Sequence, residues 1–335
     1  MASTNNKGVE TIPDRQMTAV QKNLFFEGMI LPVCVYLRMN PNTYLMIGKT
    51  SDRAQFQNLH AFSKEAVGVF VRNDDYPVFM QLVAQFTGKL VIQKKVPDQV
   101  KVKFLGSLLA DALVNLEKSE FTSASKIQKV SQLVIQTSQN LSVFDQVLDA
   151  IKDLPGDELK HSMLTCLISM LICDEMNLSL PMAREKVAMG ALLHDIGLRF
   201  IPKEISDKPR HLLTQSEQQL FETHPLKGIE ALRDMKDLPS DVILIVAEHH
   251  ENAHGTGFPR RLRDIKISPL ARIVGLANYY AGLIMNLRAD GKSYTADEAV
   301  HYIEDTLGQP FNKQVFTALK NIINKKHLSD KSNLP

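Results

Sequence analysis

The hydrophobic pattern changes once along the chain, from alternating positions to helical spacing. Apolar residues alternate over residues 31–37, and Pro41-Asn42 separates them from a second apolar run at residues 44–47. A period of two is typical of strands and Pro-Asn of a turn, so we expect two strands here and a third at residues 68–71. Helices are predicted at residues 52–64 and 76–88, which completes a ββαβα unit.

After about residue 98 the apolar residues recur at intervals of three and four. One such face runs over residues 105–116 and another over residues 127–134, which predicts two helices. We favour packing into a core for this pair, with a connector or dimer stalk as the alternative. The ten-residue apolar stretch at residues 164–173 is too short for a membrane span, which needs about twenty residues, and is interpreted as a buried helix.

These patterns predict a mainly α protein, in which an all-helical C-terminal bundle follows a small α+β N-terminal domain. Residues 1–22 are polar and lack an apolar signal core, so we expect a flexible tail without an export signal. The expected boundaries are residues 23–92 for the α+β regulatory or docking domain, 93–140 for a helical connector and 141–335 for the bundle.

Composition narrows the class of protein further. The 335 residues are 44% hydrophobic and 23% charged, which is ordinary for globular domains. A formal net charge of +2 argues against a general binder of DNA, RNA or membrane surfaces. Three cysteines without CxxC spacing fit a reducing compartment, and we expect a cytoplasmic protein with no membrane span.

Candidate chemistry is concentrated in the histidines. Seven of the ten lie between His161 and His254, and five of them form an ordered series. Histidine is the commonest protein ligand of transition metals, and a carboxylate can bridge two cations. The series and its one adjacent carboxylate consist of His161, His194-Asp195, His224 and His249-His250.

Each member of this series is predicted near a helix end. His194-Asp195 ends a helix that begins near Pro181, and Gly197 breaks it, so both side chains can converge on one cavity. The pair His249-His250 ends the helix that follows Ser240-Asp241. The sequence therefore predicts a multinuclear metal site in which Asp195 bridges two cations.

The order H…HD…H…HH, followed by a G-x-G-aromatic-Pro loop at residues 255–259, resembles the HD-GYP group of the HD phosphohydrolase superfamily. The resemblance spans about residues 148–293 and includes Lys208-Pro209, Glu217 and residues 271–273. It implies an HD-type helical bundle that holds two or three metals, commonly iron, and hydrolyses cyclic di-GMP. The N-terminal unit also resembles that of an unconventional HD-GYP protein, through a segment containing Tyr76.

The resemblance and the ligand count together give a set of expected roles. Two divalent or trivalent cations are expected, iron first, with manganese, nickel or zinc open because the donors are nitrogen and oxygen. Asp195, Lys208 and Arg272 are the expected catalytic residues. The expected metal ligands are His161, His194, Asp195, His224, His249, His250 and Asn278.

The chain departs from the family pattern at several positions. Phe258 replaces the tyrosine of the GYP loop, and Leu198 replaces a lysine, so two polar contacts to substrate are lost. Asn278 replaces an aspartate, which removes a negative charge from one metal. His254 replaces a loop aspartate, and Asp157 replaces a longer glutamate, so we expect two metals rather than three.

Two functions follow from these observations. The first is a metal-dependent phosphodiesterase that uses a metal-activated water on cyclic di-GMP or a related phosphodiester, with weak activity. The alternative is a catalytically degenerate HD-GYP protein that binds a nucleotide or a protein in signalling. A helical scaffold with incidental histidines is the least favoured interpretation. A signalling protein partner and a homodimer stay open.

Overall fold

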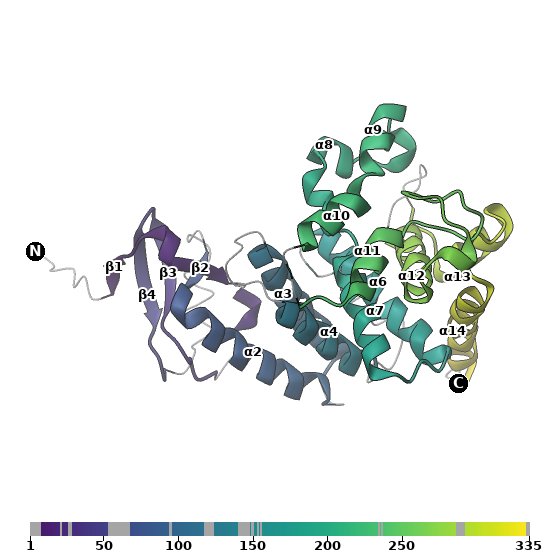
Figure 1. The fold of residues 1–335 in the computed structure, drawn as a ribbon. Coiled ribbons are helices and arrows are strands. Elements are labelled where there is room, and N and C mark those ends of the chain that lie inside the picture. The colour runs from purple at the N-terminus through teal and green to yellow at the C-terminus, as the bar shows by residue number, and fades with distance from the viewer. Residues whose placement is uncertain are drawn as a thin grey trace, which may run out of the picture. The chain divides into compact units, whose positions relative to one another are not determined.

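The computed structural model of the protein divides into two compact units, Met1–Glu117 and Lys118–Pro335. It describes residues 8–332 except 21, 26–28, 53–67, 94–95, 117–123, 140–147, 149–150, 153, 155, 234, 236 and 286–291. The first unit contains a sheet and helices, whereas the second is built from helices, which confirms the predicted fold class (Figure 1).

The first unit is organised around a five-stranded antiparallel sheet with the order β1-β4-β3-β5-β2. Its strands are β1 (Val9–Thr11), β2 (Met17–Val20), β3 (Val35–Asn40), β4 (Thr43–Gly48) and β5 (Val69–Arg72). The three strands predicted from sequence are the central three, β3, β4 and β5. The predicted helix at residues 52–64 falls almost wholly outside the described residues.

The segment expected to be a flexible tail instead forms both edges of this sheet, so that prediction is wrong for residues 8–20. β1 pairs with β4, and β2 pairs with β5. Ile12 and Met17 are buried against Tyr36 and Tyr44. The apolar side chains of this segment are scattered among polar ones and form a weak periodic signal, so its pairing in the sheet is not visible from the sequence.

Two helices follow the sheet within the first unit. α2 (Tyr76–Val91) places Phe79 and Val83 in the core, and α3 (Asp98–Leu116) packs against α2. The buried face of α3 includes Val102, Leu105 and Leu109. Packing into a core, the interpretation favoured from sequence, is therefore what this helix does.

The structure does not set the predicted connector, residues 93–140, apart as a region of its own. α3 belongs to the first unit, whereas α4 (Ala124–Ser138) belongs to the second and packs on α6 and α7. Ile127, Val130 and Val134 on α4 are buried. The sequence separates the two helices correctly but does not reveal which core each one joins, because both carry an apolar face.

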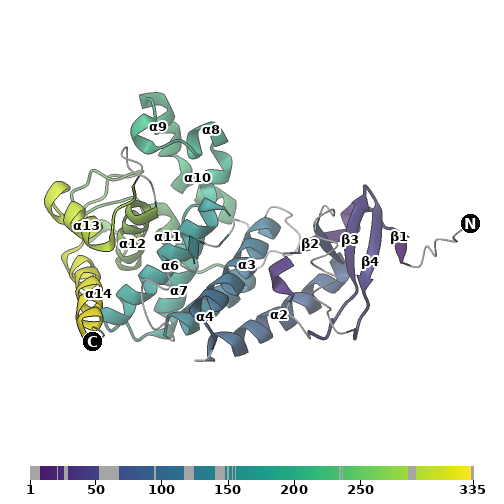
Figure 2. The ribbon, with the colours of Figure 1, turned by 180° about the vertical axis from the view of Figure 1, so that it is seen from behind.

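The second unit is a bundle centred on α6 (Asp157–Glu175), α7 (Pro181–Leu193), α11 (Ser240–Glu248) and α12 (Pro269–Met285). Nearly every residue of the apolar stretch at residues 164–173 is buried within α6, as expected. α14 (Lys313–Ser332) packs against α6 (Figure 2). Among the described residues, no helix is both long and apolar enough to cross a bilayer.

Shorter elements surround this bundle. They are η4 (Ile196–Phe200), α8 (Lys203–Ser206), η5 (Arg210–Leu212), α9 (Gln215–Phe221), α10 (His224–Leu232), η6 (Asp264–Lys266), α13 (Ala296–His301) and η7 (Tyr302–Thr306). α9 begins with a capping box, in which Thr214 and Glu217 satisfy each other's backbone N–H. α10 packs on η4 and α11, which brings three helix ends together.

Candidate metal centre

Five histidines and one aspartate from four separate segments converge in the second unit. His161 lies on α6, His194-Asp195 directly follows α7, His224 opens α10, and His249-His250 directly follows α11. Their potential ligand atoms form two groups, and within each group all atoms lie within 4.8 Å of one another. The groups are His161, His194 and Asp195, and Asp195, His224, His249 and His250.

The two carboxylate oxygens of Asp195 face different groups. Oδ2 lies 3.0 Å from Nε2 of His194 and 3.7 Å from Nε2 of His161. Oδ1 lies 3.3 Å from Nε2 of His224 and 3.5 Å from Nε2 of His249. We call the atoms around Oδ2 the first ligand group and those around Oδ1 the second ligand group. This arrangement is the one a bridging carboxylate requires.

Backbone contacts fix the protonation of three of these rings. Nδ1 of His194, His224 and His249 each lies 2.8 Å from the carbonyl oxygen three residues earlier. A carbonyl oxygen only accepts, so Nδ1 carries the proton and donates it, and in the neutral ring Nε2 has a free lone pair. Three lone pairs therefore point towards the Asp195 carboxylate.

In the neutral rings, two of these lone pairs face each other. Nε2 of His224 and Nε2 of His249 are 3.2 Å apart. Nε2 of His194 is buried, and Oδ2 of Asp195 approaches it to 3.0 Å. Buried acceptors without donors are costly, and a cation placed between them removes the cost. The residues present therefore fit a metal centre.

The electrostatics of the centre favour the same conclusion. Burial raises the pKa of the Asp195 carboxyl, but His194 and the other neighbouring imidazoles lower it well below its ordinary value. Burial lowers the pKa of His249 to about 4, and burial with nearby positive charge lowers the pKa of His250. Burial lowers the pKa of His194, but the Asp195 carboxylate outweighs burial and raises it above its ordinary value. An ionised carboxylate beside imidazoles that can give up their Nε2 proton is the donor set that a transition metal binds.

Asn278 lies beside the first ligand group. It lies buried on α12, and its Oδ1 is 2.7 Å from Nε2 of His161. The amide oxygen that the sequence predicts as a ligand is therefore at the first group. Because an amide is neutral, this group has one negative charge, on Asp195, which it shares with the second group.

Gly197 allows the close approach that brings Asp195 to His224. A Cβ at this position would lie 1.9 Å from the carbonyl oxygen of His224 and 2.6 Å from the backbone nitrogen of Gly228. The backbone of η4 therefore rests directly on the first turn of α10. The glycine of the HDIG sequence is required for this contact, since any side chain would push the two segments apart.

The loop after His250 folds back over that histidine. A Cβ on Gly257 would lie 2.3 Å from the carbonyl oxygen of His250, and the Phe258 ring stacks on the His250 ring with centroids 4.3 Å apart. The buried Glu251 carboxylate accepts hydrogen bonds from the backbone nitrogens of Arg260 and Leu262 at 2.7 and 2.8 Å. These bonds hold the loop and its aromatic ring in place.

The two basic residues expected to contact substrate, Lys208 and Arg272, are bound to acceptors of the protein itself. Lys208 donates to both carboxylate oxygens of Glu217, at 3.1 and 2.9 Å. Arg272 donates to the carbonyl oxygen of Ile267 and lies 3.5 Å from the Asp264 carboxylate. Catalytic roles for Lys208 and Arg272 stay predictions. Asp195 lies at the centre of the site, as expected.

A third cation, Arg210, lies near the cluster and was not singled out from the sequence. Its guanidinium carbon is 5.1 Å from the centroid of the Phe258 ring. In the sequence it is one of several basic residues in the helical region, and each of those is more commonly a solvated surface charge. No local signal separates it from Lys208 or Arg272, because the distinction depends on tertiary contacts.

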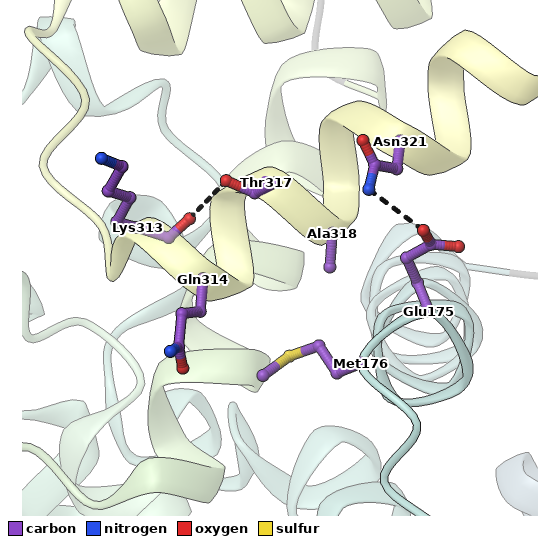
Figure 3. Close-up of a pocket in the computed structure, with 7 residues that line it drawn as sticks. All are labelled: Glu175, Met176, Lys313, Gln314, Thr317, Ala318 and Asn321. Atoms are coloured by element: carbon purple, nitrogen blue, oxygen red, sulfur yellow. Dashed lines mark hydrogen bonds between the residues drawn. The ribbon is translucent and has the colours of Figure 1, made fainter.

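A separate hollow of about 510 Å³ lies between the end of α6 and α14 (Figure 3). Glu175 and Asn321 are joined across it by a 3.1 Å hydrogen bond. The residues that line it are Glu175, Met176, Lys313, Gln314, Thr317, Ala318 and Asn321. None of these is a predicted site residue, so the candidate chemistry stays with the histidine cluster.

Comparisons with known proteins agree with this geometry. A family model described as the HD domain matches residues 127–315. A cyclic di-GMP phosphodiesterase of Pseudomonas aeruginosa is 33% identical over 158 residues, which cover 47% of this chain and 37% of that protein. A 3'3'-cGAMP-specific phosphodiesterase of Vibrio cholerae is 26% identical over 220 residues, which cover 62% of this chain and 47% of that protein. The chain thus spans less than half the length of these two relatives.

A solved structure has a similar fold over most of the chain. It is an HDG"Y"P protein from Bdellovibrio bacteriovorus, with a TM-score of 0.65 and 18% identity. The match covers 92% of this chain and 99% of that one. At this identity the likeness concerns the fold, and it extends beyond the helical unit that contains the candidate metal centre.

Proposed function

This chain belongs to the HD domain family, as its resemblance to the HD-GYP group predicts, and we propose that it is a metal-dependent phosphodiesterase. One observation carries the proposal. The Nε2 atoms of three buried imidazoles converge on the two oxygens of Asp195, and those of His224 and His249 lie 3.2 Å apart. Such an arrangement is suited to a pair of cations.

The two ligand groups would each hold one cation. His161, His194 and Asn278 with Oδ2 of Asp195 form one set, and Oδ1 of Asp195 joins the second. The remaining ligands of the second set are His224, His249 and His250. When bound, the metals supply Lewis acidity and lower the pKa of water towards neutrality. We expect iron from the family resemblance, although nitrogen and oxygen donors also suit manganese, nickel or zinc.

The protein groups have separate tasks in this reaction. Asp195 stays ionised and balances the charge of both cations. The hydrogen bonds from Nδ1 of His194, His224 and His249 to the backbone hold each ring at a set angle. The side chains of His194, His224 and His249 are fully buried, so bulk water is excluded from that side of the centre.

The proposed substrate is cyclic di-GMP or a related cyclic dinucleotide. The two relatives described above are named as a cyclic di-GMP phosphodiesterase and a 3'3'-cGAMP-specific phosphodiesterase. An anionic phosphodiester is the kind of group that a dinuclear cation centre polarises and holds. We place the reaction in the cytoplasm, in keeping with the sparse cysteines of the sequence.

We expect the activity to be weak. Phe258 and Leu198 replace a tyrosine and a lysine of the family pattern, and each lost polar contact is typically worth about 1–3 kcal/mol when buried. Together they could lower catalytic efficiency by roughly 10²- to 10⁴-fold. The double variant Phe258→Tyr with Leu198→Lys should therefore hydrolyse cyclic di-GMP faster than the wild type.

A second function is supported by the loop over the second ligand group. Phe258 stacks on His250, so a phenyl ring and not a hydroxyl meets whatever binds there. With Asn278 neutral at the first group, the chain would then bind a nucleotide or a signalling protein without turnover. Tight binding of cyclic di-GMP by calorimetry, with no product after long incubation of the metal-loaded double variant, would favour this function.

Elemental analysis of gently purified protein, followed by incubation with cyclic di-GMP and chromatography, tests the enzyme proposal. We expect two metals per chain and slow formation of linear product. His249→Ala should lose metal and activity, whereas His254→Ala, which removes an exposed histidine outside the two ligand groups, should keep both. Well under one metal per chain in the wild type would contradict the proposal.

A further inference from the structure

Arg210 lies between two aromatic rings beside the candidate metal centre. Its guanidinium carbon is 5.0 Å from the centroid of Phe221 and 5.1 Å from that of Phe258. Both distances are within the range of cation–π attraction, which acts in addition to packing. The guanidinium is therefore held by two ring faces at a set place.

The same two rings contact the histidines of the second ligand group. The Phe221 ring lies 5.0 Å from the His224 ring, and the Phe258 ring lies 4.3 Å from the His250 ring. One phenylalanine ring thus lies between the Arg210 guanidinium and each of two proposed ligands, His224 and His250.

Other cations near the centre are already bound to protein acceptors. Lys208 pairs with Glu217, Arg272 with the Ile267 carbonyl and Asp264, Arg260 with Glu248, and Lys227 with the Phe200 carbonyl. Arg210 differs from them. Within the described part of the chain, its guanidinium makes neither a hydrogen bond nor an ion pair, and its side chain is exposed to solvent. Five N–H donors are therefore available to a ligand.

We propose that Arg210 binds a phosphate group of the substrate at the rim of the metal centre, beside His224 and His250. The proposal rests on the phosphodiesterase function proposed above. A planar guanidinium matches the oxygens of a phosphate with two parallel hydrogen bonds. A cyclic dinucleotide carries two phosphodiester groups, so one can lie at the metals while Arg210 contacts oxygens at the rim.

This role gives Phe258 a function that the sequence comparison alone does not suggest. A phenyl ring keeps the face on which Arg210 and His250 rest, although it lacks the hydroxyl of the expected tyrosine. The ring thus positions the donors of Arg210, although the contact that the hydroxyl would make is still lost. Phe258→Leu should release the guanidinium and weaken phosphate binding, even though Arg210 itself is unchanged.

Calorimetric titration of the metal-loaded full chain with cyclic di-GMP, and separately with inorganic phosphate, tests the proposal. Arg210→Ala should weaken both ligands by about 10- to 100-fold, and Arg210→Lys, which keeps the charge without the planar fork, by less. Arg233→Ala removes the same charge from an exposed residue at the end of α10 and should leave both affinities unchanged. Metal content should be the same in all four proteins.

The outcomes separate this proposal from the proposed function. If no protein turns over cyclic di-GMP but Arg210→Ala still binds it and phosphate more weakly, the phosphate contact stands and the enzyme proposal fails. Unchanged affinities in fully metal-loaded Arg210→Ala overturn the contact. So does weaker cyclic di-GMP binding with unaltered phosphate binding, which would indicate that Arg210 contacts a base. Absence of any binding to the metal-loaded wild type overturns it as well.

Discussion

The two ligand groups share Asp195 but differ in how many of their other members are buried imidazoles held by the backbone. In the second group, His224 and His249 are fully buried imidazoles, each tied through Nδ1 to its own backbone. In the first group only His194 is held in this way, whereas the His161 side chain is 20% exposed and its partner is the amide of Asn278. Rigid, desolvated donors bind a cation more tightly than exposed or neutral ones, so the second group should fill first and empty last.

The largest effect is expected from removing the residue that both groups share. Asp195→Ala should lose both metals, because each group would then lack its only carboxylate. Elemental analysis checks this, with Asp207→Ala, at an exposed aspartate of the same unit, as the control. If Asp195→Ala retained a full complement of metal, the bridging assignment would be wrong. Retention of one metal would show that the second group is sufficient without it.

The next largest effect is expected from a steric change at Gly197, which should distort the second ligand group. In Gly197→Ala the new methyl group would overlap the backbone of His224, which cannot move aside without displacing α10. We expect a loss of about 3 kcal/mol of folding stability and a large loss of metal. Denaturant unfolding of the metal-free protein measures the first effect. In Gly228→Ala the added carbon mainly meets the Val246 side chain, so a smaller loss is expected there.

Restoring a negative charge at position 278 should narrow the difference in metal affinity between the two groups. Asn278→Asp places a carboxylate near His161 Nε2, and the first cation should bind roughly tenfold more tightly or better. Competition with a chelator should release metal from the wild type in two stages and from this variant in stages that lie closer together. Unchanged release from Asn278→Asp would mean that Asn278 is not a ligand.

The smallest effect is expected at an ion pair that belongs to neither group. The hydrogen bond from Lys208, with those from Thr214, lowers the pKa of Glu217 to about 2. A lowered pKa means that this stabilisation is complete above the ordinary value of 4.5 and is lost as the pH falls towards 2. Glu217→Gln should melt slightly earlier than the wild type at pH 7, and the difference should vanish in acid. Glu204→Gln, at an exposed carboxylate, should melt like the wild type at both pH values.

The positions of the histidines could be predicted because each follows from local sequence. A helix end places His194-Asp195 and His249-His250 where side chains converge, and the breaking residues, such as Gly197, are visible in the sequence. The structure brings all these residues together, with Asn278 beside His161. Whether they bind metal stays a prediction.

The parts that could not be predicted depend on contacts between distant segments. The strands at residues 9–11 and 17–20 are too short to show a period, and their pairing with β4 and β5 orders them. Which of Lys208, Arg210 and Arg272 stays unpaired depends on which of these side chains contacts an acceptor from a distant segment. That Glu217, the capping partner of Thr214, also binds Lys208 depends on the same kind of contact.

The backbone carbonyls that orient His194, His224 and His249 have a consequence for how this protein tolerates mutation. These partners belong to Ala191, Phe221 and Val246, and a substitution at any of them changes a side chain but leaves the carbonyl in place. Each ring is thus aligned by the last turn before it, without an orienting residue that a point mutation could delete. A library of substitutions should therefore find loss of metal at the ligands, at Gly197 and at changes that unwind the helix ends. At the orienting positions themselves, which are buried, substitutions that keep the packing should keep the metal, and larger changes should act through the stability of the fold.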